Sequence, residues 1–300
     1  MHAPVEEEGI RVGPVEGWMV RTRSTIGFVK GCLHPLPYLY YVPRVIAGIK
    51  LYDEPGITSA VKFAEPELIR EDPCLGLRTT LVHIKEAGFT TPWDAARRLL
   101  KTCKRRICQT ALSLIEQIEN ANPRVLVGVT GSLAYNPTEA EDIDIVAYSQ
   151  PSELQDVYRL LAELREEGYL KPYHGEGHQW SSSDKELNLR LSEKRVLLGI
   201  VDSFEYNVKL VACLAPARCV RLRRIGETVW RGRVCTSINY TIPSLYVICN
   251  GGRRVNMLTY RIRYTEIPAG VDIEVRGWLE EWCSGLKVLV PDHGGHVKLL

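Results

Sequence analysis

The chain has 300 residues, of which 25% are charged and 45% hydrophobic, with a formal net charge of +2. This length predicts about two domains, or three small ones, and the composition is that of a folded globular protein without repeats or low-complexity segments. No apolar run reaches the roughly 18 residues of a membrane helix, and Glu6, Glu7 and Glu8 stand where a signal peptide would have a basic start and an apolar core. We therefore expect a cytoplasmic protein that does not bind membranes.

Residues 1–90 are predicted to form a β-rich segment. Short runs of β-branched and aromatic residues are separated by glycines and prolines, which is typical of a sheet built from hairpins. The runs span residues 18–20, 26–29 and 38–42. Two short helices are expected after them, at 57–63 and 66–71.

The clearest helix signal begins at Thr91, which can cap a helix whose first position is Pro92. Apolar residues then recur at helical spacing as far as Ile118, and Asn122-Pro123 ends the pattern. The opposite face carries six basic residues within ten positions: Arg97, Arg98, Lys101, Lys104, Arg105 and Arg106. This basic face at 97–106 is either a solvated helix surface or a contact for a nucleic-acid backbone.

A glycine-serine pair followed by two closely spaced carboxylates is the most informative feature. Residues 125–129 are predicted to form a strand that delivers Gly131 and Ser132 to a turn, and Asp142 and Asp144 fall on a second strand. Side chains two apart share a strand face, so the two carboxylates stand together, and a divalent cation would relieve their repulsion. The glycine lets backbone N–H groups approach a phosphate, and the serine hydroxyl adds a donor. The alternative is a tight turn followed by a surface strand with two solvated aspartates.

A helix at 151–167 and a second helix-like run at 185–198 are expected after this motif, followed by a strand at 204–210. A third carboxylate on a neighbouring strand would complete a two-metal site. Glu205 lies inside the strand pattern and is our candidate, whereas Asp202 precedes the strand beside Ser203, where turn chemistry explains it. Phosphate partners or simple surface charges are expected at Lys194, Arg195 and Lys209. The pair His174 and His178 is assigned a structural or solvated role, because the glycines between them disfavour a helix.

Residues 216–300 carry 13 Lys and Arg against 7 Asp and Glu, a charge of +6. Short strands at roughly ten-residue spacing predict a small barrel, of the oligonucleotide-binding (OB) type. The expected strands are 229–233, 237–242, 245–249, 255–263 and 271–279. Its arginines, interleaved with tryptophan and tyrosine, could follow a phosphate backbone and stack bases, or could simply form a solvated face.

The nine cysteines include no Cys-x-x-Cys pair, which argues against a zinc ribbon. Their odd number leaves at least one thiol free. We expect most of them to be small buried hydrophobic residues.

The order of strand, Gly131-Ser132, about ten residues, and Asp142-x-Asp144 on a second strand resembles the DNA polymerase beta nucleotidyltransferase superfamily. Looser matches along nearly the whole chain resemble an archaeal family of predicted nucleotidyltransferases. They are Gly17-Trp18, Phe28–Gly31 with His34-Pro35, Ser203–Lys209, Ile242–Val247 and Tyr260–Tyr264. Two positions depart from the superfamily pattern: Tyr135-Asn136 replaces a frequent Arg-Gly, and Glu141 replaces a frequent serine. Asn136 could still adopt a left-handed turn conformation.

The resemblance implies an α+β protein with three parts: a β-rich segment at 1–90, a nucleotidyltransferase core with a mixed sheet and helices at 91–215, and a small basic β-barrel at 216–300. It implies an enzyme that moves a nucleoside monophosphate from a nucleoside triphosphate to a hydroxyl of RNA, protein or a small molecule. Two Mg²⁺ ions would be held by Asp142, Asp144 and Glu205. Gly131 and Ser132 would hold the β- and γ-phosphates. The alternative is a catalytically degenerate protein that binds nucleic acid on the same scaffold.

Overall fold

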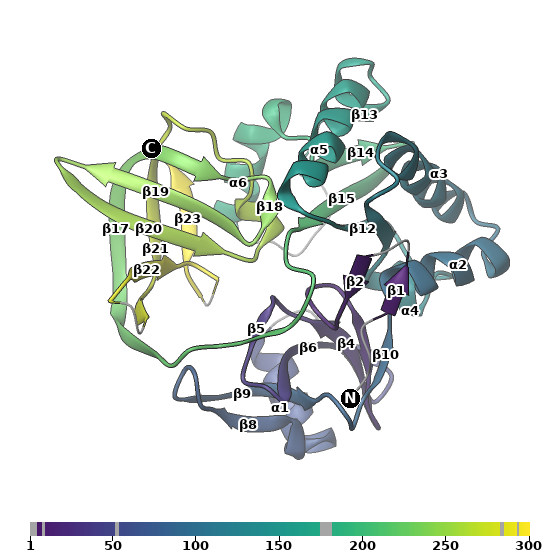
Figure 1. Ribbon diagram of the computed structural model, residues 1–300, viewed down its shortest axis with the longest axis horizontal. Helices are drawn as coiled ribbons and strands as arrows, with labels where there is room; N and C mark the ends of the chain where they lie inside the picture. Colours follow the sequence, from purple (N-terminus) through teal and green to yellow (C-terminus); the bar gives the residue numbers. More distant parts are fainter. Residues whose placement is uncertain (1–4, 8–9, 52–53, 175–181, 283–284, 293) are drawn as a thin grey trace. The chain divides into compact units, whose positions relative to one another are not determined.

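Figure 1 shows the computed structural model of the chain, which describes residues 5–7, 10–51, 54–174, 182–282, 285–292 and 294–300. The chain forms two compact units, residues 1–157 with 213–219 and residues 158–212 with 220–300. The fold class is α+β with several sheets, as predicted. None of the described helices is long and apolar enough to cross a membrane.

An antiparallel sheet forms the N-terminal part of the first unit, and its order is β10-β3-β4-β6-β9-β8 with β7 beside β6. The strands are β3 (Met19–Arg21), β4 (Thr25–Val29), β6 (Tyr38–Ile46), β7 (Ile49–Lys50), β8 (Ile69–Asp72), β9 (Leu77–His83) and β10 (Gly88–Thr90). A separate pair, β1 (Val5–Glu7) and β2 (Ile10–Val12), precedes it. The prediction of a sheet built from hairpins is confirmed.

The helices expected before residue 72 are only partly correct. Helix α1 (Glu54–Ala64) replaces the first, but the second reduces to one 3-10 turn, η1 (Pro66–Leu68). Residues 69–72 are strand β8 instead, because they pair with β9, where Ile69 lies opposite Thr80. A long-range pairing thus overrides the local helical pattern.

The long helix predicted from Thr91 is two helices, α2 (Pro92–Thr102) and α3 (Arg106–Ala121). The predicted cap is present, since Oγ1 of Thr91 accepts the Asp94 N–H at 3.0 Å. Cys103 is extended and ends α2, and its disulfide to Cys108 closes the break. The apolar spacing continues through the break, so periodicity alone did not show it.

Two short antiparallel strands, β11 (Leu126–Val129) and β12 (Asp142–Tyr148), follow, with Val129 opposite Ile145. Helix α4 (Gly131–Tyr135) lies between them in the chain. Gly128 of β11 packs so closely on the first turn of α2 that an added Cβ would overlap Pro92. Helix α5 (Pro151–Glu166) then carries the chain into the second unit and ends before Gly168, whose φ is +78°.

The cysteines were expected to be mostly small buried hydrophobic residues; four of them are buried, but most of the nine are paired in disulfides. Four disulfides join eight of the nine: Cys32–Cys213, Cys74–Cys219, Cys103–Cys108 and Cys235–Cys249. The first two attach the segment 213–219 to the N-terminal sheet region. There β16 (Ala217–Arg218) pairs in parallel with β5 (Leu33–His34). Cys283 lies outside the described residues.

The second unit begins with an antiparallel meander, β13 (Leu170–Lys171), β14 (Leu198–Val201) and β15 (Phe204–Val211). Between β13 and β14 lie α6 (Ser182–Leu191) and η2 (Ser192–Lys194). The helix predicted at 185–198 is therefore too long, because Leu198 already pairs with Asn207 of β15. Strand β15 matches its prediction and also pairs in parallel with β18 (Thr241–Ile242).

The C-terminal part of this unit is a closed ring of five strands in the order β17-β19-β20-β22-β21, with β21 returning to β17. The strands are β17 (Leu222–Ile238), β19 (Ser244–Asn250), β20 (Arg253–Thr259), β21 (Asp272–Trp282) and β22 (Lys287–Val290), with β23 (His296–Leu299) beside β21. Only β20 and β22 are parallel. Two strands predicted at 229–242 are mostly one, because β17 continues through a bulge between Val234 and Thr236. Leu187 and Leu191 of α6 join the core of this ring, with Tyr246 and Met257.

Candidate functional site

In the first unit, Gly131 lies so close to the Asp144 carboxylate that no residue with a side chain would fit at position 131. Gly131 has a φ of +60°, which is costly for a residue with a side chain, and it begins α4 directly after β11. A Cβ added to Gly131 would lie 2.7 Å from Cγ of Asp144. The glycine therefore leaves the space that the Asp144 carboxylate occupies.

The two carboxylates share one face of β12, as predicted. Asp142 and Asp144 are half-buried, whereas Ile143 and Ile145 between and after them are fully buried. The Ser132 hydroxyl donates to Oδ1 of Asp142 at 3.2 Å, and the Thr130 N–H donates to the Asp144 carbonyl at 2.9 Å. The structure thus brings Gly131, Ser132, Asp142 and Asp144 together in one small site.

Hydrogen bonds to residues that precede the N-terminal sheet hold β12 and the start of α4 in place. Oγ1 of Thr130 donates to the Gly17 carbonyl at 2.8 Å, and the Tyr148 hydroxyl at the end of β12 donates to the Glu16 carbonyl at 2.6 Å. Burial raises the pKa of Tyr148 well above its usual value, and the nearby Glu16 charge raises it further. Tyr148 therefore stays a neutral hydrogen-bond donor.

Two of the residues that depart from the superfamily pattern, Tyr135 and Asn136, have structural partners. Tyr135 lies beside Phe28 of β4, with ring centroids 6.5 Å apart. Asn136 has a φ of −145°, so the expectation of a left-handed conformation is wrong. Its N–H instead caps α4 by donating to the Ser132 carbonyl at 2.8 Å. Its side-chain amide donates to Glu139 at 2.8 Å.

Arg105 positions the loop that leads into Asp142, a role that the sequence did not indicate. Its Nη1 donates to the carbonyls of Pro137, Thr138 and Ala140 at 2.8, 2.8 and 3.0 Å. Arg98 reaches the Ala134 carbonyl at 3.4 Å in the same way. Two members of the predicted basic face therefore bind backbone carbonyls about 35 residues further along the chain, and no local pattern could have shown this.

Glu205 and Lys209 share one face of β15 in the second unit, because side chains alternate along a strand. Both are half-buried, and the Glu205 charge helps burial to raise the pKa of Tyr173 to about 12. Asp202 and Ser203 form the two-residue turn between β14 and β15, with φ values of +48° and +70°. Asp202 is therefore a turn residue, as predicted, whereas Glu205 lies inside the strand.

Arg195 is the clearest correction among the predicted site residues. It is 1% exposed, and its Nε lies 3.5 Å from a carboxylate oxygen of Glu266. Its guanidinium also donates to Asn188, to the Ile262 carbonyl at 2.8 Å and to the Thr265 carbonyl at 3.0 Å. Arg195 is neither a surface charge nor accessible to a phosphate, whereas Lys194 beside it is exposed.

Burial shifts the pKa of each residue of this pair in the direction that favours its neutral form. Desolvation lowers the pKa of Arg195 and raises that of Glu266, and the attraction between the two charges opposes both shifts. Glu266 also accepts the Val196 N–H at 2.8 Å and the Leu197 N–H at 3.2 Å. The pair joins η2 to the segment after η3 (Ile262–Tyr264).

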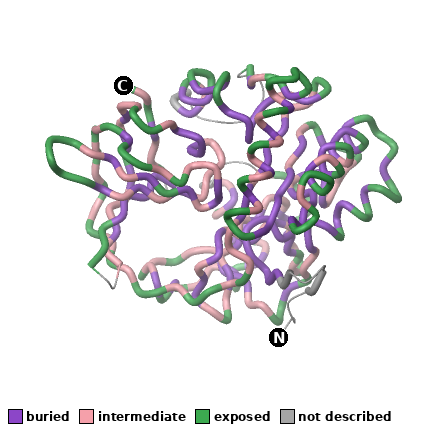
Figure 2. The backbone as a smooth tube through the Cα atoms, turned by 45° about the horizontal axis from the view of Figure 1, so that its top comes forward, coloured by how far each residue is buried: buried purple, intermediate pink, exposed green. Residues whose placement is uncertain are grey.

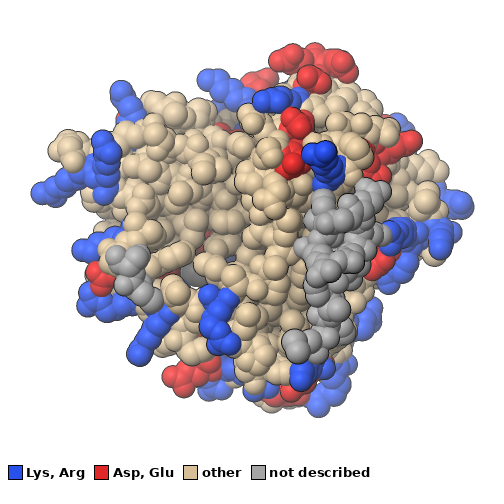
Figure 3. All heavy atoms as spheres, in the orientation of Figure 1, with Lys and Arg blue, Asp and Glu red and all other residues tan. Residues whose placement is uncertain are grey.

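The arginines of the barrel are largely matched by carboxylates on the neighbouring strand. Strand β21 pairs with β17 from Leu222 to Arg233. The ion pairs between these two strands are Arg223–Glu281, Arg224–Glu280, Arg231–Glu274, Arg233–Asp272 and Arg276–Glu227. In the part of the chain that the structure describes, Arg253 and Arg254 make no ion pair. They are exposed where β20 begins, after the turn from β19 that projects from the barrel (Figures 1 and 2). Figure 3 shows Lys and Arg side chains standing out on this side of the barrel, at the left.

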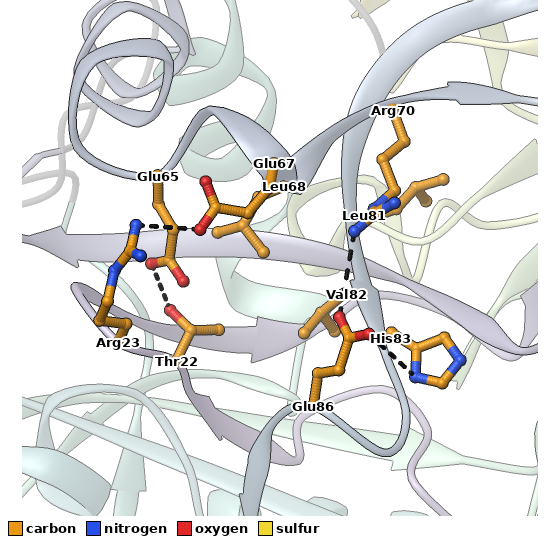
Figure 4. A pocket seen from close by; sticks show the side chains of 10 residues that line it. All are labelled: Thr22, Arg23, Glu65, Glu67, Leu68, Arg70, Leu81, Val82, His83 and Glu86. Atoms are coloured by element: carbon orange, nitrogen blue, oxygen red, sulfur yellow. Dashed lines mark hydrogen bonds and ion pairs between the residues drawn. The ribbon is translucent and has the colours of Figure 1, made fainter.

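A separate pocket of about 180 Å³ opens on the N-terminal sheet. Figure 4 shows that its charged side chains bind one another across its walls. Thr22 donates to Glu65 at 2.7 Å, Arg23 pairs with Glu67 at 2.9 Å, and Arg70 lies 3.9 Å from Glu86. It contains none of the predicted site residues, and we assign it no chemistry. The predicted pair His174 and His178 lies partly outside the described residues, since residue 178 is not among them.

Comparison with known proteins identifies no family. No family model and no curated protein matches the chain. Among solved structures, the chain is similar to one described as "Structure and Conformational Change of a Replication Protein A Heterotrimer Bound to ssDNA" at 14% identity, with a TM-score of 0.22. The match covers 25% of this chain and 58% of the other. So loose a superposition carries no argument, and we draw neither fold nor function from it.

Proposed function

We propose that this protein is a metal-dependent nucleotidyltransferase of the DNA polymerase beta superfamily, which moves a nucleoside monophosphate from a nucleoside triphosphate to a hydroxyl acceptor. The observation that supports this most is the fit of the Asp144 carboxylate into the space left by Gly131. The backbone is held at a φ that favours glycine, where a larger residue would displace the carboxylate. A turn that served only to reverse the chain would not need this fit.

The residues present suit Mg²⁺, which takes oxygen ligands and is usually held by one or two carboxylates plus substrate phosphates. Asp142 and Asp144 would supply carboxylate oxygens from one face of β12, and Glu205 would supply the third carboxylate. Bound Mg²⁺ would lower the pKa of the acceptor hydroxyl and neutralise the leaving pyrophosphate.

The remaining residues would bind and orient the substrate. Gly131 has no side chain, so backbone N–H groups beside it could approach the phosphates. The Ser132 hydroxyl has one proton, which it donates to Asp142, so binding a phosphate oxygen would require this hydroxyl to rotate. The phosphates would be bound by two lysines. Lys209 lies on the same face of β15 as Glu205, and Lys194 is exposed. Arg195 is not a phosphate partner, because it is enclosed by protein groups.

The test is transfer of label from each nucleoside triphosphate to total RNA or protein, with Mg²⁺ present and absent. We expect Mg²⁺-dependent transfer that falls to background in Asp142→Asn and Asp144→Asn. Glu205→Gln should lose activity, whereas Asp202→Asn, its matched control in the β14–β15 turn, should keep it. Activity that survives in both Asp142→Asn and Asp144→Asn would refute the assignment.

For the barrel we propose the OB type and a role in binding a nucleic-acid strand as the acceptor. The strand order 1-2-3-5-4-1, with its third and fifth strands parallel, supports this fold type, because OB folds are five-stranded Greek-key barrels. The arginines of β17 are not the basis of this proposal, since carboxylates of β21 meet them. Arg253 and Arg254 support it better, because exposed cations without an ion pair can release counterions from a phosphate backbone.

Binding of a fluorescent single strand, measured at several salt concentrations, tests this role. We expect Arg253→Gln/Arg254→Gln to reduce the slope of log K against log salt by roughly 1.4, about 0.7 for each lost phosphate contact. The matched control Arg231→Gln/Arg233→Gln should leave the slope unchanged. Retained binding together with no transfer by the wild-type protein would favour the alternative, a catalytically degenerate nucleic-acid-binding protein.

A further inference from the structure

Three groups with metal-ligand chemistry meet in the first unit, away from Gly131 and Asp144. Asp72 ends β8, Cys74 follows it in the turn to β9, and Cys219 follows β16. A carboxylate oxygen of Asp72 and the two sulfur atoms all lie within 4.8 Å of one another. No other set of three His, Cys, Asp or Glu side chains is grouped so closely within the described ranges.

Asp72 has an unsatisfied oxygen in this group. The residue is 0% exposed, and its Oδ1 accepts the Cys74 N–H at 2.8 Å and the Leu75 N–H at 3.3 Å. Its Oδ2 is buried without a hydrogen-bond partner. A buried carboxylate oxygen without a partner is costly, so this position favours a bound cation.

Hydrogen bonds hold the backbone of both cysteines in addition to the disulfide between them. Cys74 is fixed by the hydrogen bonds of the β8–β9 turn to Asp72. Cys219 is fixed by its own N–H, which donates to the His34 carbonyl at 2.9 Å, next to the parallel pairing of β16 with β5. Reduction would therefore leave two thiols close to the Asp72 carboxylate.

We propose that Asp72, Cys74 and Cys219 bind a zinc-class divalent metal ion when the Cys74–Cys219 disulfide is reduced. Two thiolates and a carboxylate are suitable ligands for Zn²⁺ or Co²⁺, and water would fill the fourth tetrahedral position. With a phosphine as reductant, disulfide, phosphine and water give two thiols and phosphine oxide. Metal binding then releases the two thiol protons.

This site would preserve one cross-link in two redox environments. The disulfide joins residues 145 apart in sequence, and it attaches the segment 213–219 to the β8–β9 turn. Under reducing conditions, where disulfides rarely persist, the metal ion would hold the same two segments together. The attachment would then be sensitive to a chelator instead of to a reductant.

Cobalt titration of the full-length protein tests the proposal. The protein is reduced with a phosphine, freed of reductant without oxygen, and titrated with Co²⁺. We expect one equivalent to produce thiolate-to-cobalt charge-transfer absorption with tetrahedral d–d bands. Cys74→Ser and Cys219→Ser should abolish the charge-transfer signal at this stoichiometry. Asp72→Asn should weaken binding more than about tenfold, because even outer-shell partners are worth 10–100-fold.

The disulfide Cys235–Cys249 provides the matched control, since no carboxylate joins it in a described group of three. Cys235→Ser/Cys249→Ser should bind Co²⁺ as the wild type does. In the wild type itself, Zn²⁺ should protect Cys74 and Cys219 from alkylation, mapped by peptide mass spectrometry, more than it protects Cys235 and Cys249. Equal protection of all four cysteines, or unchanged Co²⁺ affinity in a folded Asp72→Asn variant, would overturn the proposal.

Discussion

The Gly131–Asp144 site and the face of the barrel formed by β17 and β21 differ in how their charged side chains are arranged. In the site, two carboxylates stand side by side on one strand face, next to a glycine with a φ of +60°. On the barrel, arginines of β17 lie opposite carboxylates of β21, and Arg231 and Glu274 are 2.6 Å apart. Both regions looked functional in the sequence because both concentrate charge.

The difference shows that the sign of the neighbour matters more than the number of charges. Like charges held close together repel one another, and a bound cation relieves that repulsion, so such a pair is a candidate binding site. Opposite charges across neighbouring strands stabilise the sheet by themselves, usually by less than 1 kcal/mol per pair. The +6 of residues 216–300 is therefore a weaker argument for a nucleic-acid partner than the count suggested.

The largest effect is expected at the buried pair of the second unit. Arg195→Met should lower the free energy of unfolding by about 3–5 kcal/mol, because it leaves Glu266 buried without its countercharge. Urea denaturation measures this, with circular dichroism at two wavelengths to check for a single transition. A loss below about 1 kcal/mol would mean that opposite charges do not stabilise this unit, and the comparison would fail.

Acid should destabilise the first unit through His34. Burial lowers its pKa to about 4, although its partners Gly31 and Glu16 act in the other direction. The unfolded chain, with a histidine pKa near 6.5, binds more protons between pH 6.5 and 4, so stability falls as pH falls through this window, by up to about 3 kcal/mol.

Unfolding free energies at pH 7, 5.5 and 4.5 would measure this slope. His34→Asn, which keeps an acceptor near the Tyr40 N–H, should flatten it, whereas His83→Asn at the end of β9 should not. If the wild type and His34→Asn lose stability in parallel, another group is responsible for the acid sensitivity.

Gly131→Ala tests whether the close fit beside Asp144 serves activity. The added Cβ would displace the carboxylate, and a misplacement of about 1 Å can reduce a rate about 100-fold. Gly168→Ala is the matched control, because Gly168 also has a positive φ but nothing within 4 Å of the added Cβ. Transfer assays and thermal melts of both variants separate the clash from the backbone strain. Equal activity in the two variants would show that the contact with Asp144 is not needed for transfer.

The smallest effect is expected on the barrel face. Arg231→Gln removes one exposed ion pair and should cost less than about 1 kcal/mol, with a difference that shrinks further in high salt. Urea unfolding at low and high salt measures it. A cost near that of Arg195→Met would mean that the cross-strand pairs act as a strongly coupled network.

Much of the fold was predictable where one local pattern decided it. The cap at Thr91, helix α5, strands β12 and β15 and the turn at Asp202 all follow from residues within a few positions of one another. The same holds for the two carboxylates, since Asp142 and Asp144 must share a face if the segment is a strand. The role of Glu205, the metal ions and the transfer reaction stay predictions, as do the domain boundaries at 90 and 215.

What failed depended on partners distant in sequence. Residues 69–72 form a strand because β9 pairs with them. The two strands predicted at 229–242 merge because β19 pairs with Arg233 to Ile238 across the bulge. In the sequence, nothing distinguishes Arg105 and Arg195 from arginines on the surface. One binds three carbonyls of a loop about 35 residues away, and the other is enclosed with Glu266, which lies 71 positions further along.

The sequence by itself determined the Gly131-Ser132 and Asp142-x-Asp144 arrangement, because strand geometry and glycine conformation are local properties of the chain. Only the tertiary structure decided which charges are neutralised, which cysteines pair and which arginine is buried. Those outcomes depend on distances across the folded chain. Charge interactions and burial are set by what lies nearby in space, and the identity of a residue does not specify its neighbours.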